Sequence, residues 1–382
     1  MKLYYIANAR MPTEKAHGIQ IAKMCEAFIE AGVDVTLVVP RRATDQRSIR
    51  EYYGLRVEVP LVCLPALDWY GRGRFGYVVA SLSFMCSYLI FLSRKKRKGE
   101  RFVLYTVDLD TFSSLALTFL QKPIFSEMHD VKHSTLAKHV LFRSVWGIIA
   151  INKIIVEELQ KNFPRSPAQY LVEPNGVDLM AFPKIEKRDA RTRLGLPQDT
   201  HIVLYAGRFF EWKGLEILPT AATETSTIRW QIVGGTEEEF KKLVKEAVPA
   251  NFFFAGSRPF NEMPLWYAAA DALLVLGTKR DIQSYRYTSP MKLFEYVATG
   301  RPIIASGTPA LREIVSEHEV LFYEPDNAQD LALVVQHAIT HGRELAPKIE
   351  AAKRLAAAFS WRARAERIVR FIEEGVSENS YV

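Results

Sequence analysis

The stretch Ser289-Pro-Met-Lys-Leu-Phe-Glu-Tyr-Val-Ala-Thr-Gly-Arg-Pro-Ile-Ile-Ala-Ser306 combines the start of a helix, its end and a following strand. Pro290 suits the first turn of a helix because the N–H it lacks would be unpaired there, and Gly300 with Pro302 ends the helix. Free N–H groups at a helix start attract phosphate. Glu295, further along the same helix, could then hold a group attached to that phosphate, such as ribose hydroxyls, although a single helix-borne Glu is more often structural.

Short apolar segments alternate with helical periods along the chain. A first series covers 3–7, 33–39, 102–107, 123–127 and 147–151, and a second covers 202–206, 228–233, 252–255, 272–276 and 303–306. This alternation predicts parallel βαβ units, hence an α/β fold with two Rossmann-like domains. A chain of 382 residues is long enough for both. The tight turn at Asn175-Gly176 and the polar stretch 184–193 place the boundary near residue 185.

A basic loop follows the first strand of the second series. The sequence Gly207-Arg-Phe-Phe-Glu-Trp-Lys-Gly214 puts Arg208 and Lys213 in this loop. Ligands of open α/β sheets bind where strands end, and one forked cation with one point charge suits a diphosphate. Such cations would stabilise the charge of a departing nucleoside diphosphate. Taken alone, basic loop residues are more often solvated and without a ligand.

The two motifs resemble retaining glycosyltransferases with the GT-B fold, those of family 4 or glycosyl transferase group 1 type. The resemblance implies two Rossmann-like domains facing a central cleft, with an acceptor-binding domain at 1–185 and a nucleotide-sugar-binding domain at 186–355. It also implies a terminal helix at 356–382 that returns to the first domain. In the family a second Glu lies eight positions before the ribose-binding acid, and here that position is Tyr287.

The same resemblance assigns roles to individual residues. Arg208 and Lys213 would bind the diphosphate and Glu295 the ribose. His129, which follows strand 123–127, would position the donor sugar or the acceptor hydroxyl. The expected catalytic residues are therefore His129, Arg208 and Lys213, and the expected donor-binding residues are Gly18, Arg208, Lys213, Tyr287, Ser289, Lys292, Leu293 and Glu295.

Three residues of the first domain keep alternative readings. Gly18 would lie beside the donor phosphates, or it would only begin a helix near residue 19. Glu127 and Asp130 could orient a partner or act as a base, and Asp130 could equally cap the next helix.

The predicted reaction moves a hexose-type sugar from a nucleotide-diphosphate sugar to an acceptor hydroxyl with retention, in polysaccharide or glycolipid synthesis. The resemblance implies neither a metal nor a cofactor. One alternative is a nucleotide-sugar epimerase of the same fold, and another is a non-catalytic protein that binds nucleotide sugar or membrane. Nucleic acid is not an expected partner, because the basic residues are not interleaved with aromatic ones in a recognisable module.

Composition favours a cytoplasmic protein with anionic partners. The three cysteines form no Cys-x-x-Cys pair, and the N-terminus runs straight into a strand without the features of a signal peptide. The net charge is +7 and the pI is about 9.1. Both values favour partners such as phosphorylated substrates or a membrane surface.

An uncharged run over 75–92 complicates the assignment to a compartment, because a basic run follows it at Arg94, Lys95, Lys96, Arg97 and Lys98. By length it reaches the threshold for a membrane span. A helix packed on the sheet agrees better with its serines and with the strand that follows. A third reading is a peripheral helix whose basic end lies on anionic lipid at the inner face of the cell membrane.

Overall fold

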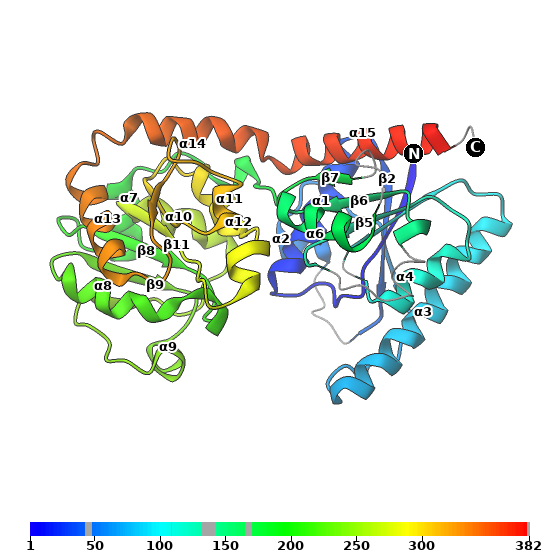
Figure 1. The fold of residues 1–382 in the computed structure, drawn as a ribbon, viewed down its shortest axis with the longest axis horizontal. Helices are drawn as coiled ribbons and strands as arrows, with labels where there is room; N and C mark the ends of the chain where they lie inside the picture. Colours follow the sequence, from blue (N-terminus) through cyan, green and yellow to red (C-terminus); the bar gives the residue numbers. More distant parts are fainter. Residues whose placement is uncertain (43–47, 108, 132–141, 165–169, 380–382) are drawn as a thin grey trace. The chain divides into compact units, whose positions relative to one another are not determined.

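The computed structural model describes residues 1–42, 48–107, 109–131, 142–164 and 170–379. The chain divides into two compact units. The first consists of Met1–Pro174 and Trp361–Val382, and the second of Asn175–Ser360. Each unit is a parallel sheet with helices packed against it (Figure 1).

The first unit contains a seven-stranded sheet with strand order β3-β2-β1-β4-β5-β6-β7. Its strands are β1 (Lys2–Ile6), β2 (Asp34–Pro40), β3 (Leu61–Leu64), β4 (Val103–Val107), β5 (Ile124–Met128), β6 (Gly147–Ala150) and β7 (Tyr170–Val172). Its described α-helices are α1 (Ala16–Glu30), α2 (Ile49–Tyr53), α3 (Gly73–Arg97), α4 (Thr111–Thr118), α6 (Lys153–Asn162) and α15 (Trp361–Asn379).

The second unit contains a six-stranded sheet with strand order β10-β9-β8-β11-β12-β13. Its strands are β8 (Ile202–Ala206), β9 (Arg229–Val233), β10 (Phe252–Phe254), β11 (Ala272–Val275), β12 (Ile303–Ser306) and β13 (Leu321–Tyr323). Its α-helices are α7 (Lys187–Leu194), α8 (Leu218–Glu224), α9 (Glu237–Val244), α10 (Met263–Ala269), α11 (Met291–Val297), α12 (Pro309–Arg312), α13 (Ala328–Thr340) and α14 (Ala346–Ala358).

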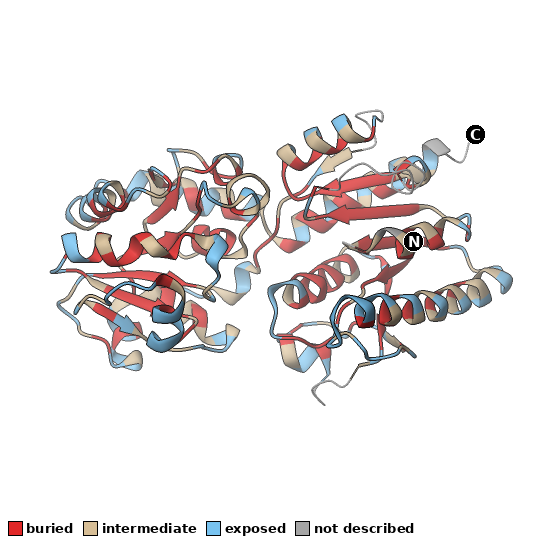
Figure 2. Cartoon of the chain, turned by 60° about the horizontal axis from the view of Figure 1, so that its bottom comes forward, coloured by how far each residue is buried: buried red, intermediate tan, exposed pale blue. Residues whose placement is uncertain are grey.

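Both faces of the second sheet are covered, because successive side chains of a strand point to opposite faces. Leu204 and Leu273 belong to the core on one face, together with residues of α10, α11 and α14. Val203 and Leu274 belong to the core on the other face, with residues of α8 and α13. Figure 2 shows the same pattern in both units, with the strands buried and the exposed residues on the outer sides of helices. Two-sided burial explains why the strands read as continuous apolar runs.

Helix α15 packs against both α1 and the sheet of the first unit. The ring of Phe371 lies 5.8 Å from that of Phe125 on β5. Gly147 at the start of β6 makes this approach possible, because a Cβ added there would lie 2.6 Å from the Phe371 ring. Helix α15 therefore packs on β5 and β6 and belongs to the core of the first unit.

The α/β class with two parallel sheets, predicted from the sequence, is confirmed. The sequence-based strand list omitted β3, β7 and β13. All three lie at sheet edges and have three or four residues each. Edge strands are less buried than central ones, so their sequences carry weaker apolar signals.

The division between the units falls at Pro174 and Asn175, earlier than the predicted residue 185. The backbone N–H of Asn175 donates to Ser289 Oγ at 3.2 Å, and its side-chain amide donates to the Ser289 carbonyl at 2.7 Å. Phe182 stacks on Tyr267 with ring centroids 6.1 Å apart. These long-range contacts attach residues 175–185 to the second unit, and turn chemistry alone gave no sign of them.

The C-terminal segment also differs from the predicted single helix over 356–382. Helix α14 ends at Ala358 within the second unit, and α15 starts at Trp361 in the first. Between them, Ser360 pairs with Val177 in an isolated parallel bridge. The N–H of Val177 also donates to the Phe359 carbonyl at 2.9 Å. The two segments that connect the units are thus hydrogen-bonded to each other.

Asp271, just before β11, joins α7 to the second sheet. Its carboxylate accepts from Lys187 Nζ and Arg191 NH2, both at 2.6 Å, and from the backbone N–H of Ile202 at 2.7 Å. Burial by itself would raise the pKa of Asp271, but these donors outweigh burial and lower it below the usual value.

We expect Asp271→Ala to destabilise the protein by about 3–5 kcal/mol at pH 7, because Arg191 would remain buried without its partner. The folded-state pKa of Asp271 is depressed, so its contribution is fully present above a pH of about 4 and is lost as the pH falls further. Urea unfolding at pH 7 and at pH 3 measures both effects. Asp189→Ala, on the exposed side of α7, is the control and should change little. An equal loss at both pH values would contradict this account.

Candidate functional site

The loop after β8 is held tightly against the loop after β9. The N–H of Gly207 donates to the Val233 carbonyl at 2.8 Å. Gly234 has a φ of +129°, and a Cβ added there would lie 2.3 Å from the Gly207 carbonyl oxygen. A Cβ on Gly235 would lie 2.3 Å from the Phe209 ring. The Val-Gly-Gly sequence therefore sets the path of the loop that carries Arg208 and Lys213.

The side chain of Lys213 packs against other residues of its own loop. Its Nζ donates to the Arg208 carbonyl at 2.9 Å and lies 5.2 Å from the Phe210 ring centroid and 5.6 Å from that of Trp212. These two rings are stacked and partly exposed. Burial, together with the charges of Lys292 and Arg208, lowers the pKa of Lys213 to about 8. Two neighbouring cations thus disfavour the charged form of Lys213, and a bound anion would relieve that repulsion.

Lys292 and Glu295 lie three residues apart on α11 and form an ion pair at 2.8 Å. Oε2 of Glu295 also accepts a hydrogen bond from the Tyr267 hydroxyl at 2.5 Å, and Lys292 Nζ lies 2.8 Å from the same hydroxyl. The Glu295 side chain is 5% exposed. Both side-chain contacts are made by one carboxylate oxygen, so the other oxygen is the one that can receive a ligand.

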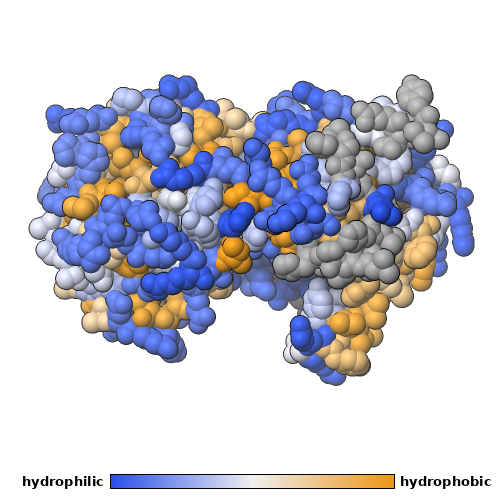
Figure 3. Space-filling view, in the orientation of Figure 1, coloured by the Kyte–Doolittle hydropathy of each residue, from blue (hydrophilic) through white to orange (hydrophobic). Residues whose placement is uncertain are grey.

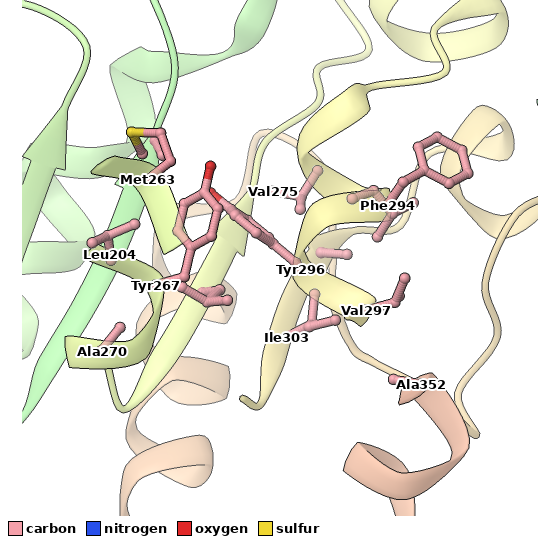
Figure 4. Close-up of a cluster of buried hydrophobic side chains, with 14 of the residues drawn as sticks. Leu204, Met263, Tyr267, Ala270, Val275, Phe294, Tyr296, Val297, Ile303 and Ala352 are labelled. Atoms are coloured by element: carbon pink, nitrogen blue, oxygen red, sulfur yellow. The ribbon is translucent and has the colours of Figure 1, made fainter. Parts of the chain in front are cut away.

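Tyr267 on α10 is a member of this site that sequence reasoning missed. It is fully buried, and its ring meets that of Tyr296 edge to face with centroids 5.1 Å apart. Figure 4 shows the two rings close together inside the core, with Met263 beside Tyr267. Burial and the Glu295 carboxylate raise the pKa of Tyr267 well above its usual value, so its hydroxyl keeps its proton. No motif surrounds Tyr267, and only the fold brings it to Glu295.

The structure gives other residues around α11 different surroundings. Helix α11 begins at Met291, so Pro290 occupies the capping position and not the first turn. Ser289 is buried and bonded to Asn175. Leu293 is fully buried in the core, where its side chain can only pack. Tyr287 is half-buried and ends a π-helical segment, Gln283–Tyr287, in which Ser284 donates from its backbone N–H to Asp281. Irregular turns of this kind are frequent at functional sites.

His129 follows β5 in the first unit and is partly exposed. Its Nε2 lies 2.7 Å from Oε1 of Glu127, which is fully buried. His129 is the first residue after β5, and this contact shows that its ring turns back toward Glu127. Glu127 thus contacts His129 directly, and its orienting role, one of the alternatives left open by the sequence, stays a prediction. The neighbouring Asp130 bonds the backbone N–H of Val131 at 2.7 Å.

Gly18 lies inside the first turn of α1, which begins at Ala16 and not near residue 19. A Cβ on Gly18 would lie 2.4 Å from Thr13 Cγ2 and 2.5 Å from the Tyr53 hydroxyl. That hydroxyl accepts from the Thr13 N–H at 2.7 Å and donates to the Thr13 carbonyl at 2.8 Å. Close packing of the preceding loop therefore requires a glycine here, whatever the ligand.

The chain is similar to known proteins both in sequence and in fold. The model of the family described as glycosyl transferases group 1 matches residues 200–341, all within the second unit. The second unit is therefore similar to a group 1 glycosyltransferase domain over most of its length. The cations Arg208 and Lys213 and the Lys292–Glu295 pair all lie inside the matched range.

Curated relatives of the chain are D-inositol 3-phosphate glycosyltransferases. That of Nocardioides sp. is 28% identical over 241 residues, which cover 56% of this chain and 50% of the relative. That of Streptosporangium roseum is 26% identical over 246 residues, which cover 58% of this chain and 53% of the relative. The chain thus spans about half the length of these relatives.

Solved structures match over the whole chain. Sucrose-phosphate synthase from Thermosynechococcus elongatus has a TM-score of 0.79 and 19% identity, with 99% of both chains covered. HepE from Anabaena, in complex with UDP and glucose, has a TM-score of 0.71 and 15% identity, covering 98% of this chain and 100% of HepE. These likenesses show the fold, which is the GT-B fold of glycosyltransferases.

Outside the range matched by the family model, α3 differs from the other described helices of the first unit in its long apolar surface. It runs through the basic segment to Arg97, and it is the one helix in the described ranges that is long and apolar enough to cross a membrane. One side is buried, with Ala80, Phe84 and Tyr88. Apolar residues on the other side are exposed: Phe75, Val78, Leu82 and Ile90. Figure 3 shows hydrophobic side chains gathered over this helix. The expectation of a helix packed on the protein holds for only one of its faces.

The five basic residues at the end of α3 have unequal surroundings. Lys95 pairs with Glu100 at 3.3 Å, and Lys96 donates to the Leu120 carbonyl at 2.8 Å. Arg94, Arg97 and Lys98 are exposed, and their side chains contact no acid within the described part of the chain. Three of the five charges are therefore available to a partner.

We expect anion binding at Lys213 to depend on pH, with inorganic diphosphate as the probe. An anion bound at Lys213 favours the charged amine, so binding should take up a proton near pH 8, and affinity should fall about tenfold by pH 9.5. Lys213→Arg keeps its charge and should bind with little change over the same range. Titration calorimetry in buffers of different ionisation enthalpy measures both affinity and proton uptake. Affinity that is constant from pH 7 to 9.5 in the parent would exclude Lys213 from the anion site.

Proposed function

We propose that the chain is a retaining glycosyltransferase that moves a hexose-type sugar from a nucleotide-diphosphate sugar to an acceptor hydroxyl. The observation that carries this proposal is the grouping of Arg208, Lys213 and Lys292 next to Glu295 within the range matched by the group 1 family model. Two motifs separated by most of that range meet in one place. Their chemistry suits a diphosphate joined to a ribose.

The cations would act on the leaving group. As the bond between the anomeric carbon and the phosphate oxygen breaks, negative charge builds on the diphosphate, and Arg208, Lys213 and Lys292 stabilise that charge. The free oxygen of Glu295 would accept hydrogen bonds from the ribose hydroxyls, with Tyr267 and Lys292 holding the carboxylate in place. Binding energy from the ribose thereby positions the diphosphate.

Retention requires the acceptor to arrive on the side from which the diphosphate leaves. We propose that the acceptor oxygen bonds to the anomeric carbon while a departing phosphate oxygen takes its proton. Glu295 is already bonded to two partners, which makes it a poor nucleophile. His129, held by Glu127, would position the sugar or the acceptor hydroxyl. This scheme uses neither a metal nor a cofactor.

HepE, a structural neighbour, was solved with UDP and glucose, so UDP-glucose is the first donor to test. A thermal-shift panel of uridine, guanosine and adenosine diphosphates and their sugar conjugates would identify the base. Binding to the folded state alone stabilises by about 2.7 kcal/mol at 100 times Kd. The curated relatives act on an inositol phosphate, which makes polyols and phosphorylated sugars the first acceptors to try.

We expect Arg208→Ala and Glu295→Ala each to weaken nucleotide binding about 10- to 100-fold, since each removes a charged hydrogen-bonding group worth about 1.5–3 kcal/mol. Lys242→Ala, an exposed cation on α9, is the matched control and should bind like the parent. Sugar transfer from the identified donor then separates a transferase from a protein that only binds. No stabilisation by any nucleotide at millimolar concentration would overturn the donor site.

We propose also that the enzyme works at the cytoplasmic face of a membrane, in polysaccharide or glycolipid synthesis, with α3 lying on anionic lipid. The exposed apolar face of α3 would enter the interface and Arg94, Arg97 and Lys98 would meet the headgroups. Each basic residue near an anionic surface contributes about 1 kcal/mol. An acceptor attached to lipid would then lie near the first unit.

Sedimentation with vesicles tests this placement. The parent should bind phosphatidylglycerol-containing vesicles and not pure phosphatidylcholine, with binding weakened by salt. Replacing Arg94, Arg97 and Lys98 by alanine should lower affinity by roughly two orders of magnitude, and Ile90→Asp should lower it further. Leu333→Asp, an equally exposed apolar position on α13, is the control. Equal binding to both kinds of vesicle would overturn the electrostatic part of the proposal.

A further inference from the structure

Glu127 on β5 is a fully buried carboxylate that receives hydrogen bonds from four parts of the first unit. Gln20 on α1 donates its amide at 2.9 Å, and Arg364 on α15 donates NH2 at 2.7 Å. The hydroxyl of Tyr105 on β4 also donates to it, at short range. His129, two residues further along the chain, completes the set at 2.7 Å. A carboxylate with this many donors has a fixed position.

The carboxylate is ionised, and the surroundings show why. Burial alone would raise the pKa of Glu127, but the charge of Arg364 and the hydrogen bonds from His129 and Tyr105 lower it to about 2. Arg364 is itself only 1% exposed, and burial opposes its charge while Glu127 favours it. Each member of this ion pair offsets much of the cost of burying the other, and Arg364 also donates to the Pro174 carbonyl at 2.7 Å and to the Glu173 carbonyl at 3.2 Å.

An ionised carboxylate can only accept hydrogen bonds, and this has a consequence for His129. The Nε2 atom, 2.7 Å from Glu127 Oε1, must carry a proton. In the neutral ring Nδ1 is then the unprotonated nitrogen. The ring is 23% exposed, so part of it is open to solvent while the bonded edge is anchored inside.

We propose that Glu127 and Arg364 are positioning residues for His129, fixing both the tautomer and the direction of its imidazole for sugar transfer. The inference rests on the proposed function. It goes further by making the C-terminal helix part of the reaction machinery, because α15 supplies the charge that keeps Glu127 ionised. Arg364 would hold Glu127 in place, and Glu127 would hold the imidazole of His129. Of the three, only His129 would touch the substrate.

A purely structural role for the ion pair is the competing explanation, and the same helix offers a control for it. One turn beyond Arg364, Arg367 pairs with the Glu173 carboxylate at 2.6 and 2.9 Å. That pair also holds α15 in place, and Glu173 meets Arg364 through its backbone carbonyl, at 3.2 Å, and not through a hydrogen bond to its carboxylate. If the Glu127–Arg364 pair only held α15 in place, removing it would affect catalysis about as much as removing the Glu173–Arg367 pair.

The test uses the full-length chain labelled with ¹⁵N-histidine, in three forms. They are the parent, the double variant Glu127→Leu with Arg364→Met, and the control Arg367→Met. The double variant removes both buried charges together and retains apolar volume, which such sites often tolerate. His129→Asn identifies the resonance of His129 among the eight histidines of the chain.

The first readout needs no turnover. A ring N–H bonded to a buried carboxylate exchanges slowly with water, so the parent and Arg367→Met should show the His129 Nε2 proton in a ¹H–¹⁵N spectrum. The double variant should lose it. If the parent lacks this proton, or if the double variant keeps it, the inference is overturned.

The second readout is steady-state transfer with the donor identified by the nucleotide panel. The double variant should lose about 10- to 100-fold in kcat, because a misplaced reacting group costs that much, while its affinity for the nucleotide stays parental. Arg367→Met should lower the thermal midpoint and leave kcat unchanged. A parental kcat in a folded double variant would overturn the positioning role. If the parent shows the His129 Nε2 proton but transfers no sugar, the proposed transferase function is wrong. The hydrogen bond between His129 and Glu127 would then exist without a role in sugar transfer.

Discussion

Parallel pairing constrains this molecule more than any other feature. In each sheet the paired strands run in one direction, so the carboxyl ends of all of them lie along the same side of the sheet. In the second unit this side gathers the residues that follow β8 and β11. In the first unit it gathers the residues that follow β1 and β5. Arg208, Lys213 and His129 each occupy such a position. The chemistry of the chain follows from where its strands end.

Positive charge is concentrated in the second unit at the place where we propose that a diphosphate binds. The charges of Lys292 and Arg208 both act on Lys213, and Glu295 is bonded directly to Lys292. The rings of Phe210 and Trp212 cover part of Lys213 and limit its access to water. Repulsion between like charges is stronger where access to water is limited, and a bound anion would reduce it. In the proposed function a diphosphate supplies the negative charge, and the ribose bonds to the remaining carboxylate oxygen of Glu295.

Buried carboxylates connect segments that are far apart in the sequence. Asp271 ties α7 to the second sheet, and Glu127 ties α1, β4 and α15 to β5. Burying such a group is costly unless every donor is in place, so each of these sites tolerates only one arrangement of its neighbours. The same property that fixes the fold makes Glu127 able to hold a histidine rigidly.

The sequence by itself determined the fold class and the local pieces of the site. Apolar strand runs alternating with helices specified two parallel sheets, and the Gly-Arg and Lys-Leu-Phe-Glu motifs specified a basic loop and an acid on a helix. These signals are local, because periodicity and capping depend on neighbours within a few residues. Only the tertiary structure decided that Tyr267 bonds Glu295, that Arg364 pairs with Glu127, and that residues 175–185 belong to the second unit. Contacts between residues separated by tens or hundreds of positions leave no periodic trace, because they arise from packing and burial once the sheets have formed.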